Sequence, residues 1–257
     1  WAIIFGIALK AASETTKTVI ENISEATSTA VRWIINLAPF GIMGLIFTTI
    51  SEQGLGVLLS YGRLICVLVG TMLFVALVLN PIVTFICTRQ NPYPLVLRCL
   101  KDSGLTAFFT RSSAANIPVN MELCKDLGLD EDTYSISIPL GATINMDGTS
   151  IMQGVAVMFA AQAFGIHLTP MDYITVIGTA TLASIGTAGI PSVGLVTLTM
   201  VFNSVGLPVE AIGIIMGIDR ILDMARTAVN ITGDAVCTTI VACQNGAVDK
   251  EVFNKAE

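Results

Sequence analysis

Long apolar runs separated by short polar breaks dominate the first third of the chain. Residues 31–50 and 57–87 are each as long as the ~20 residues that cross a bilayer, and polar residues 51–54 separate them. No charged residue lies between positions 64 and 88. We predict two membrane-spanning helices here, preceded by a polar peripheral helix over residues 10–29.

Beyond residue 89 the apolar segments are interrupted. Residues 105–121 are cut by a polar stretch at 110–118 that contains a proline, which predicts a helix, a turn and a second helix. Residues 173–202 repeat this design around a tip at 184–194 that is rich in glycine and also contains a proline. The pattern therefore predicts two helical hairpins.

Each predicted hairpin is followed by an apolar span that carries polar residues. We expect residues 134–165 to form a helix that is broken at Gly141 and unwound at residues 145–149, and residues 211–243 to form one helix. Two halves with interrupted segments in corresponding positions are typical of inverted-repeat transporters, whose site lies near the membrane midplane.

Composition and charge narrow the class of protein. The 257 residues are 53% hydrophobic and 12% charged, against roughly 25% charged in soluble domains, which predicts an integral membrane protein. The net charge is −6 with no basic cluster, so nucleic-acid binding is excluded. Six cysteines without a CxxC motif and ten methionines are expected to be packing residues. Because the chain begins within an apolar segment, we expect that N-terminal helices are missing from it.

The last predicted helix carries the most informative polar residues. Helical spacing places five of them on one stripe, namely Asp219, Asp223, Arg226, Asn230 and Asp234. An ionisable group within a membrane span costs roughly 2.5–3.5 kcal/mol on insertion scales, so such a stripe should face partners, ions or a water-filled cavity. The arginine could neutralise its neighbours or receive an acidic substrate, and a structural ladder of ion pairs is the alternative.

The interrupted segments suggest complementary chemistry. Unwinding residues 145–149 would free carbonyl oxygens for a hard cation such as Na⁺, although an ordinary turn between two helices is the alternative. Hydroxyl and N–H groups at residues 112–113 would favour an anion near a helix start. Gly186, Gly189 and Gly194 would let the second tip approach a ligand and act as a gate.

Other function classes fit less well. The chain has one histidine and no arrangement of a nucleophile with a base, so we expect no enzyme activity. A channel would also contain broken helices and intramembrane charges, but it would conduct without a fixed substrate stoichiometry.

Four strings in the same order resemble the glutamate transporter family, the dicarboxylate/amino acid:cation symporters, in its prokaryotic type. They lie at residues 111–113, 145–149, 186–191 and 219–234. The resemblance covers nearly the whole chain, from the end of a fourth transmembrane segment to an eighth.

The resemblance implies an all-α integral membrane fold with inverted repeats, two re-entrant helical hairpins and interrupted transmembrane helices. It further implies an elevator-type transporter that is a homotrimer and crosses the plasma (inner) membrane several times. Residues 1–88 would form scaffold and peripheral helices, and residues 89–257 the transport core.

The resemblance also implies a substrate site and Na⁺ sites. Its substrate residues would be Ser112, Ser113, Thr149, Gly189, Ile190, Gly194, Asp223, Arg226, Thr227 and Asn230. Asp223 would bind the α-amino group, Arg226 a side-chain carboxylate, and Ser113 the α-carboxylate. The Na⁺ ligands would come from Gly141, Asn145, Asn230 and Asp234 at one site, from Thr143, Ser184, Ile185 and Thr187 at another, and from Asn145 and Asp147 at a third.

The choice of substrate depends on Arg226. An unpaired guanidinium opposite a neutral side chain would be costly, so we predict an acidic amino acid or a C4-dicarboxylate that enters with Na⁺. The tip at residues 111–118 is more similar to the bacterial serine/threonine branch. The alternative is therefore a neutral serine/threonine symporter in which Asp219 or Asp223 satisfies Arg226 internally.

Overall fold

The computed structural model describes residues 57–187, 189, 193–216 and 218–249, together with positions 9, 12–20, 22, 23, 26, 51 and 253. The chain divides into two compact units, Trp1–Thr48 and Thr49–Glu257. In the first unit residues 14–20 are helical, as predicted, whereas the predicted span at 31–50 lies outside the described residues. Apart from one isolated β-bridge, the regular structure of the described residues is helical, which confirms the all-α prediction.

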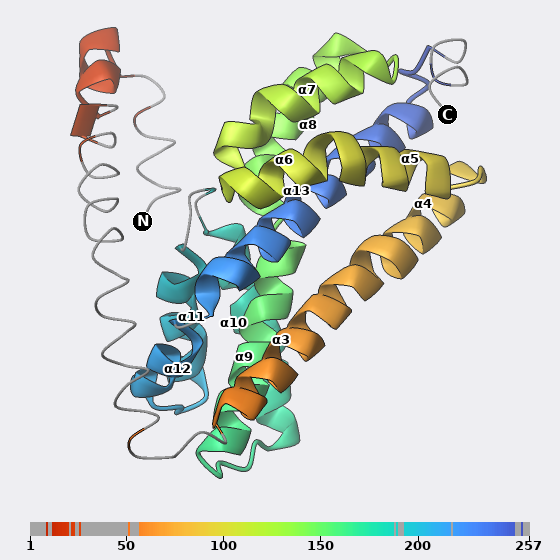
Figure 1. Cartoon of the computed structure of the whole chain (residues 1–257). Helices are drawn as coiled ribbons and strands as arrows, with labels where there is room; N and C mark the ends of the chain where they lie inside the picture. Colours follow the sequence, from red (N-terminus) through yellow and green to blue (C-terminus); the bar gives the residue numbers. More distant parts are fainter. Residues whose placement is uncertain are drawn as a thin grey trace. The chain divides into compact units, whose positions relative to one another are not determined.

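The predicted span at residues 57–87 is a continuous helix (Figure 1). It consists of α3 (Val57–Phe74), a π-helical turn (Val75–Leu79) and α4 (Asn80–Thr88). Its segment Gly62–Thr88, with a mean hydropathy of 2.4, is the one helix of the described part that is long and apolar enough to cross a membrane. The helix continues through Pro81, directly after the π-helical turn.

The first hairpin, residues 93–126, confirms the predicted helix, turn and helix. Its first arm is α5 (Tyr93–Cys99), a π-helical turn (Leu100–Gly104) and α6 (Leu105–Thr110); its second arm is a 3₁₀ turn (Ala114–Asn116) and α7 (Ile117–Asp126). The first arm begins at Tyr93, earlier than predicted. The arm ends where Arg111 adopts the left-handed conformation (φ 55°), which stops an α-helix.

The next span is unwound at the predicted place. α8 (Glu131–Ile144) and α9 (Asp147–Ala163) are separated by Asn145 and Met146, whose ψ angles of 79° and 44° are not helical. The predicted break at Gly141 is wrong, because α8 continues for three more residues. Gly141 instead provides room for a side chain of another helix, described below.

The second hairpin, residues 170–204, consists of α10 (Pro170–Ile185) and α11 (Val193–Ser204), as predicted. α10 begins with a capping box in which Thr169 and Asp172 bind each other's backbone N–H groups. Gly186 ends this helix, and Ile190, Pro191 and Ser192 of the tip lie outside the described residues.

The predicted single helix at 211–243 is wrong at its beginning. A 3₁₀ turn (Val209–Ala211) and the short α12 (Ile212–Met216) precede a separate, longer α13 (Asp219–Gln244). Ile218 lies between them with a φ of −115°. Asp219 therefore occupies the first turn of α13, where the helix dipole stabilises a carboxylate.

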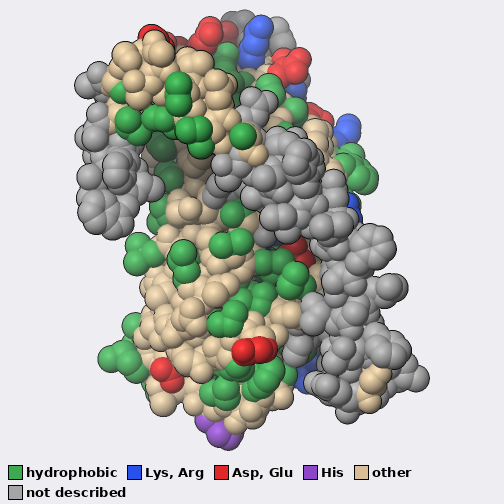
Figure 2. Space-filling model, turned by 90° about the vertical axis from the view of Figure 1, so that its left-hand side faces the viewer, with side chains coloured by type: hydrophobic (Ala, Val, Ile, Leu, Met, Phe, Trp, Pro, Cys, Tyr) green, Lys and Arg blue, Asp and Glu red, His purple; other side chains and the backbone are tan. Residues whose placement is uncertain are grey.

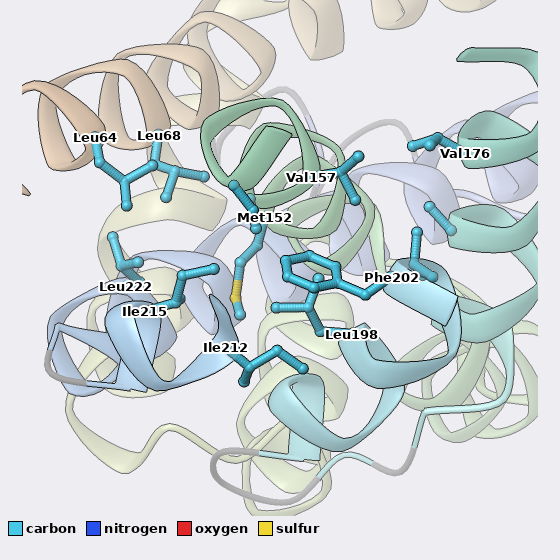
Figure 3. Packing of buried hydrophobic residues seen from close by; sticks show 14 of the residues in the cluster. Leu64, Leu68, Met152, Val157, Val176, Leu198, Phe202, Ile212, Ile215 and Leu222 are labelled. Atoms are coloured by element: carbon cyan, nitrogen blue, oxygen red, sulfur yellow. The ribbon is translucent and has the colours of Figure 1, made fainter. Parts of the chain in front are cut away.

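Two apolar clusters hold the second unit together. In the first, Met152 of α9 lies between Leu222 and Ile215 on one side and Leu198 and Phe202 on the other (Figure 3). The second lies between the first hairpin, α8 and the C-terminal half of α13. Large apolar side chains are also exposed along α3, α4, α8 and α10, and Figure 2 shows hydrophobic side chains on the outside of the face that it presents. An apolar exterior is expected of a chain that faces lipid.

Candidate functional site

The polar stripe of α13 is buried. Its five predicted members, Asp219, Asp223, Arg226, Asn230 and Asp234, are all 4% exposed or less. α13 is surrounded by α9, α8 and the first hairpin, which the ribbon in Figure 1 shows on either side of it. Burial of this many polar groups requires partners, and most of those partners come from the interrupted segments.

Arg226 is paired within its own helix. Its Nη2 donates to Oδ1 of Asp223, one turn earlier, and both side chains are buried. Arg111, at the tip of the first hairpin, lies 3.9 Å from the other oxygen of Asp223. The structure therefore contains the internal ion pair of Arg226 with Asp223, the predicted alternative to a substrate carboxylate.

Gly194 of α11 makes room for this ion pair. A Cβ atom on Gly194 would overlap Nη1 of Arg226, so a larger residue would displace the guanidinium. The same Nη1 lies 3.4 Å from the sulfur of Met152. The expectation that every methionine only fills space is thus incomplete, because this thioether is a weak acceptor for a buried cation.

The unwound segment between α8 and α9 packs directly on α13. The Asn145 side chain donates to the carbonyl oxygen of Asn230 (3.0 Å), and the Gly148 N–H donates to Oδ1 of Asn230 (2.8 Å). A Cβ on Gly233 would lie 2.9 Å from Nδ2 of Asn145 and 3.0 Å from Oδ2 of Asp147. The other oxygen of Asp147 is buried without a hydrogen-bond partner in the part of the chain that the structure describes. A buried, unpartnered carboxylate oxygen fits a bound cation.

Asp234 faces α8 and the first hairpin. A Cβ on Gly141 would overlap its Oδ1, which explains the glycine at this position of an unbroken helix. Its Oδ2 lies 3.4 Å from Nδ2 of Asn120 in α7. The structure thus brings together Gly141, Asn145, Asn230 and Asp234, the residues of the first predicted Na⁺ site.

The tips of the two hairpins meet. The Ser112 hydroxyl donates to the Gly189 carbonyl oxygen (2.8 Å), and the N–H of Ala114 lies 3.2 Å from the same oxygen. A Cβ on Gly189 would lie 2.9 Å from the Ala114 nitrogen and 3.2 Å from the carbonyl oxygen of Ala142. Among the other predicted substrate residues, Ser113, Thr149 and Thr227 are buried, whereas Ile190 lies outside the described residues.

Of the four residues predicted for the second Na⁺ site, only two are buried. Ser184 and Thr187 are buried and belong to a hydrogen-bond chain that includes Gln153 and Thr197. Thr143 and Ile185 are exposed, and the Thr143 hydroxyl donates to the Leu140 carbonyl of its own helix. The role of Thr143 and Ile185 stays a prediction.

Sequence reasoning missed several partners of these residues. They are Arg111, Asn120, Met146, Met152 and Gln153. Arg111 and Gln153 carried a signal, because a charged or amide group within an apolar segment requires an explanation. The methionines carried none, because a sulfur that accepts a hydrogen bond cannot be distinguished by pattern from one that fills a core.

Comparisons with known proteins identify the family of the chain. Residues 1–243 match the model of the sodium:dicarboxylate symporter family. A serine/threonine transporter SstT from Streptococcus agalactiae is 49% identical over 261 residues, which cover 99% of this chain and 63% of that protein. A serine/threonine transporter SstT from Streptococcus thermophilus is 49% identical over 246 residues, which cover 93% of this chain and 61% of that protein.

This chain thus spans about three fifths of the length of the curated relatives that it matches. The family match extends over almost all of the second unit, including both hairpins, the unwound segment and the buried stripe of α13. The predicted resemblance is confirmed, and so is the prediction of a transporter family rather than an enzyme family. The chain belongs to the sodium:dicarboxylate symporter family.

Proposed function

We propose that the protein is a Na⁺-coupled symporter for serine and threonine. The observation that carries this proposal is the buried ion pair between Arg226 and Asp223. A buried guanidinium without a carboxylate would require one from the substrate, because leaving it unpaired costs about 3–5 kcal/mol. The pair removes that requirement, so a neutral side chain can occupy the site.

The names of the relatives support the same substrate class. Proteins that are 49% identical to this chain are named serine/threonine transporters. The tip at residues 111–118 is similar to that branch as well. An acidic amino acid or a C4-dicarboxylate is the second candidate, favoured by the presence of an arginine beside Asp223, and it would require Arg226 to leave this partner.

The substrate would lie among the two tips and α13. Asp223 would bind the α-amino group, and Ser113 with the backbone at Gly189 would bind the α-carboxylate. The remaining residues of the proposed substrate site would lie beside the ligand. These are Ser112, Thr149, Ile190, Gly194, Arg226, Thr227 and Asn230.

Na⁺ would enter with the substrate as the second cargo. The unpartnered oxygen of Asp147 and the Asp234 carboxylate against Gly141 supply the hard oxygen ligands that Na⁺ prefers. The remaining proposed ligands are Thr143, Asn145, Ser184, Ile185, Thr187 and Asn230. Occupation by Na⁺ would offset the negative charge beside the substrate and so couple the two binding events.

The wider arrangement follows the family. We propose several membrane crossings in the plasma (inner) membrane, re-entrant hairpins related as inverted repeats, a homotrimer, and an elevator motion of a core formed by residues 89–257. Residues 57–88 belong to the same compact unit as this core, and α3 packs on α9. The division at residue 88 stays a prediction.

Uptake by liposomes tests the proposed function. Labelled L-serine or L-threonine should accumulate in liposomes that contain the protein when Na⁺ is outside, and accumulation should cease when K⁺ replaces Na⁺ or when an ionophore dissipates the gradient. Asp102→Asn, which removes an exposed ion pair with Arg98 on the first hairpin, serves as the matched control and should transport normally. Serine uptake that is equal in Na⁺ and K⁺ would contradict the proposal.

A further inference from the structure

A chain of buried amide and hydroxyl groups joins the first hairpin to Asp234. Ser103, Asn116 and Asn120 are all 0% exposed and come from three different elements of the hairpin. Nδ2 of Asn116 donates to the Ser103 hydroxyl (2.6 Å), and that hydroxyl donates to Oδ1 of Asn120. The amide of Asn120 then reaches α13, where Nδ2 donates to the Ile231 carbonyl (3.2 Å) and to Oδ2 of Asp234 (3.4 Å).

The acceptors on α13 set the direction of the hydrogen bonds that Asn120 makes. A serine hydroxyl has a single proton, and the NH₂ group of Asn116 already donates to Ser103, so the Ser103 proton is available for Asn120. If the Asn120 amide were turned over, its oxygen would face the carboxylate of Asp234. Two acceptors would then be in contact in a buried site, which is unfavourable. Ser103, whose proton goes to Oδ1 of Asn120, supports the orientation in which Asn120 donates to α13.

The two oxygens of Asp234 consequently have different surroundings. Oδ2 receives the hydrogen bond from Asn120, whereas Oδ1 points at the backbone of α8, where the absence of a side chain on Gly141 makes room for it. A carboxylate that is held by one oxygen presents the other in a fixed direction, and such outer partners of metal-ligating groups tune the affinity of the metal.

We propose that Asn120 is a positioning residue for the Na⁺ ligand Asp234, and that Ser103 and Asn116 set its orientation. This inference rests on the proposed function, because it assumes that Asp234 binds Na⁺. It adds a link between Na⁺ occupancy and the first hairpin. Asn120 of α7 binds Asp234, and the hydrogen bonds from Asn120 through Ser103 to Asn116 lead toward the tip of this hairpin. Asn120 itself does not touch Na⁺.

The test is a Na⁺ titration of thermal stability, without substrate and without transport. Na⁺ that binds the folded protein raises its melting temperature by an amount that grows with ln(1 + c/Kd), where c is the Na⁺ concentration, so a fit of the rise gives the Kd for Na⁺. Asn120→Leu keeps a similar volume but removes the donor, and this Kd should rise roughly tenfold. Ser103→Ala is the milder variant, which frees the amide of Asn120, and its Kd should rise about threefold.

The matched control is Ser137→Ala. The Ser137 hydroxyl also makes a hydrogen bond to α13, with Thr238 (3.0 Å), but it does not contact Asp234. This variant should lower the melting temperature without changing the Kd for Na⁺. If the role of Asn120 is merely structural, Asn120→Leu and Ser103→Ala should behave like this control: a lower melting temperature with unchanged Na⁺ affinity.

Two outcomes would overturn the inference and can be told apart. A wild-type melting temperature that responds to Na⁺, with an unchanged Kd for Na⁺ in both variants, would refute the role of Asn120 and leave the proposed function intact. A wild-type protein whose stability ignores Na⁺, and whose serine uptake ignores it as well, would refute both.

Discussion

The two hairpins contact the rest of the core by different means. The first hairpin packs along α13 and is joined to it by buried polar side chains, with Asn120 at the centre. The second packs mainly on α9, where Gln153 bonds to both of its arms, and its Gly189 carbonyl accepts hydrogen bonds from the first tip. It approaches α13 through Gly194, where a side chain is absent, and no hydrogen bond joins the second hairpin to α13 among the described residues. Directional hydrogen bonds to α13 fix a position on that helix, whereas close backbone approach only excludes bulk. The second hairpin is therefore the better candidate for a gate, and the first for a fixed part of the site.

The largest effect should come from adding bulk to the second hairpin beside the ion pair. In Gly194→Ala the new methyl group would overlap the Arg226 guanidinium and separate it from Asp223. Breaking a buried ion pair costs about 3–5 kcal/mol, so serine uptake should fall by about 100-fold or more. Gly178→Ala on the same hairpin, where a Cβ has no neighbour within 4 Å, should transport normally. Equal activity of the two variants would show that Gly194 is not needed for the pair.

A smaller loss is expected at the contact between the tips. Gly189→Ala would press a methyl group against the backbone of Ala114 and Ala142, which cannot rotate away as a side chain can. Overpacking costs about 1–3 kcal/mol, so the KM for serine should rise roughly tenfold. Gly186→Ala in the same tip meets only ordinary contacts at 3.5 Å and should leave the KM unchanged. A normal KM in Gly189→Ala would mean that the tips separate when substrate binds.

The polar connection of the second hairpin to α9 should matter for stability more than for substrate affinity. Gln153 donates to Thr197 (2.8 Å) and accepts from Ser184 (3.2 Å), so it joins both arms of the hairpin. Gln153→Leu leaves these hydroxyls without that partner, at a cost of about 2 kcal/mol. Thermal unfolding of the purified protein measures the loss, for which Ser204→Ala, at an exposed contact with Thr179, is the control. An unchanged melting temperature of Gln153→Leu would show that the hydrogen bonds of Gln153 do not stabilise the second hairpin against α9.

The smallest effect is expected where the first hairpin meets α13 through a glycine. A Cβ on Gly104 would lie 2.7 Å from Oγ1 of Thr232 and 3.2 Å from the end of the Leu100 side chain. These approaches are less close than that of a Cβ on Gly194 to Nη1 of Arg226, and alanine favours a helix by about 0.5–1 kcal/mol, so Gly104→Ala should destabilise the protein by about 1 kcal/mol or less. Gly70→Ala, which has no neighbour within 4 Å, should be neutral or stabilising. A loss of serine uptake in Gly104→Ala as large as that in Gly194→Ala would contradict the distinction between a fixed first hairpin and a mobile second one.

The predictions from sequence were most accurate where composition changes sharply along the chain. The span at 57–87, both hairpins and the unwinding at Asn145 all follow from apolar periodicity and its interruption. The break assigned to Gly141 failed because a helical glycine can serve close packing as well as a turn, and only the partner helix decides between them. The boundary between α12 and α13 was missed because the apolar pattern continues across Ile218.

The polar stripe of α13 was predictable from the sequence, but the pairing within it was not. Helical spacing placed Asp223 and Arg226 on one face, yet the same spacing allows the arginine to bind a substrate carboxylate or its neighbour. The prediction of an acidic substrate depended on that choice. Contacts between distant segments, such as Ser112 with Gly189 or Asn120 with Asp234, have no local signature and could not be found without the fold.

The central claim is that Asp223 neutralises Arg226, so that the site accepts a neutral side chain. Competition during Na⁺-driven uptake of labelled L-serine tests it most directly, with unlabelled L-threonine and L-aspartate added in parallel at 100-fold excess over serine. Threonine should abolish the labelled uptake, and aspartate should leave it nearly unchanged. Strong inhibition by aspartate, together with Na⁺-driven uptake of labelled aspartate, would show that Arg226 leaves Asp223 to bind a substrate carboxylate and would contradict the account.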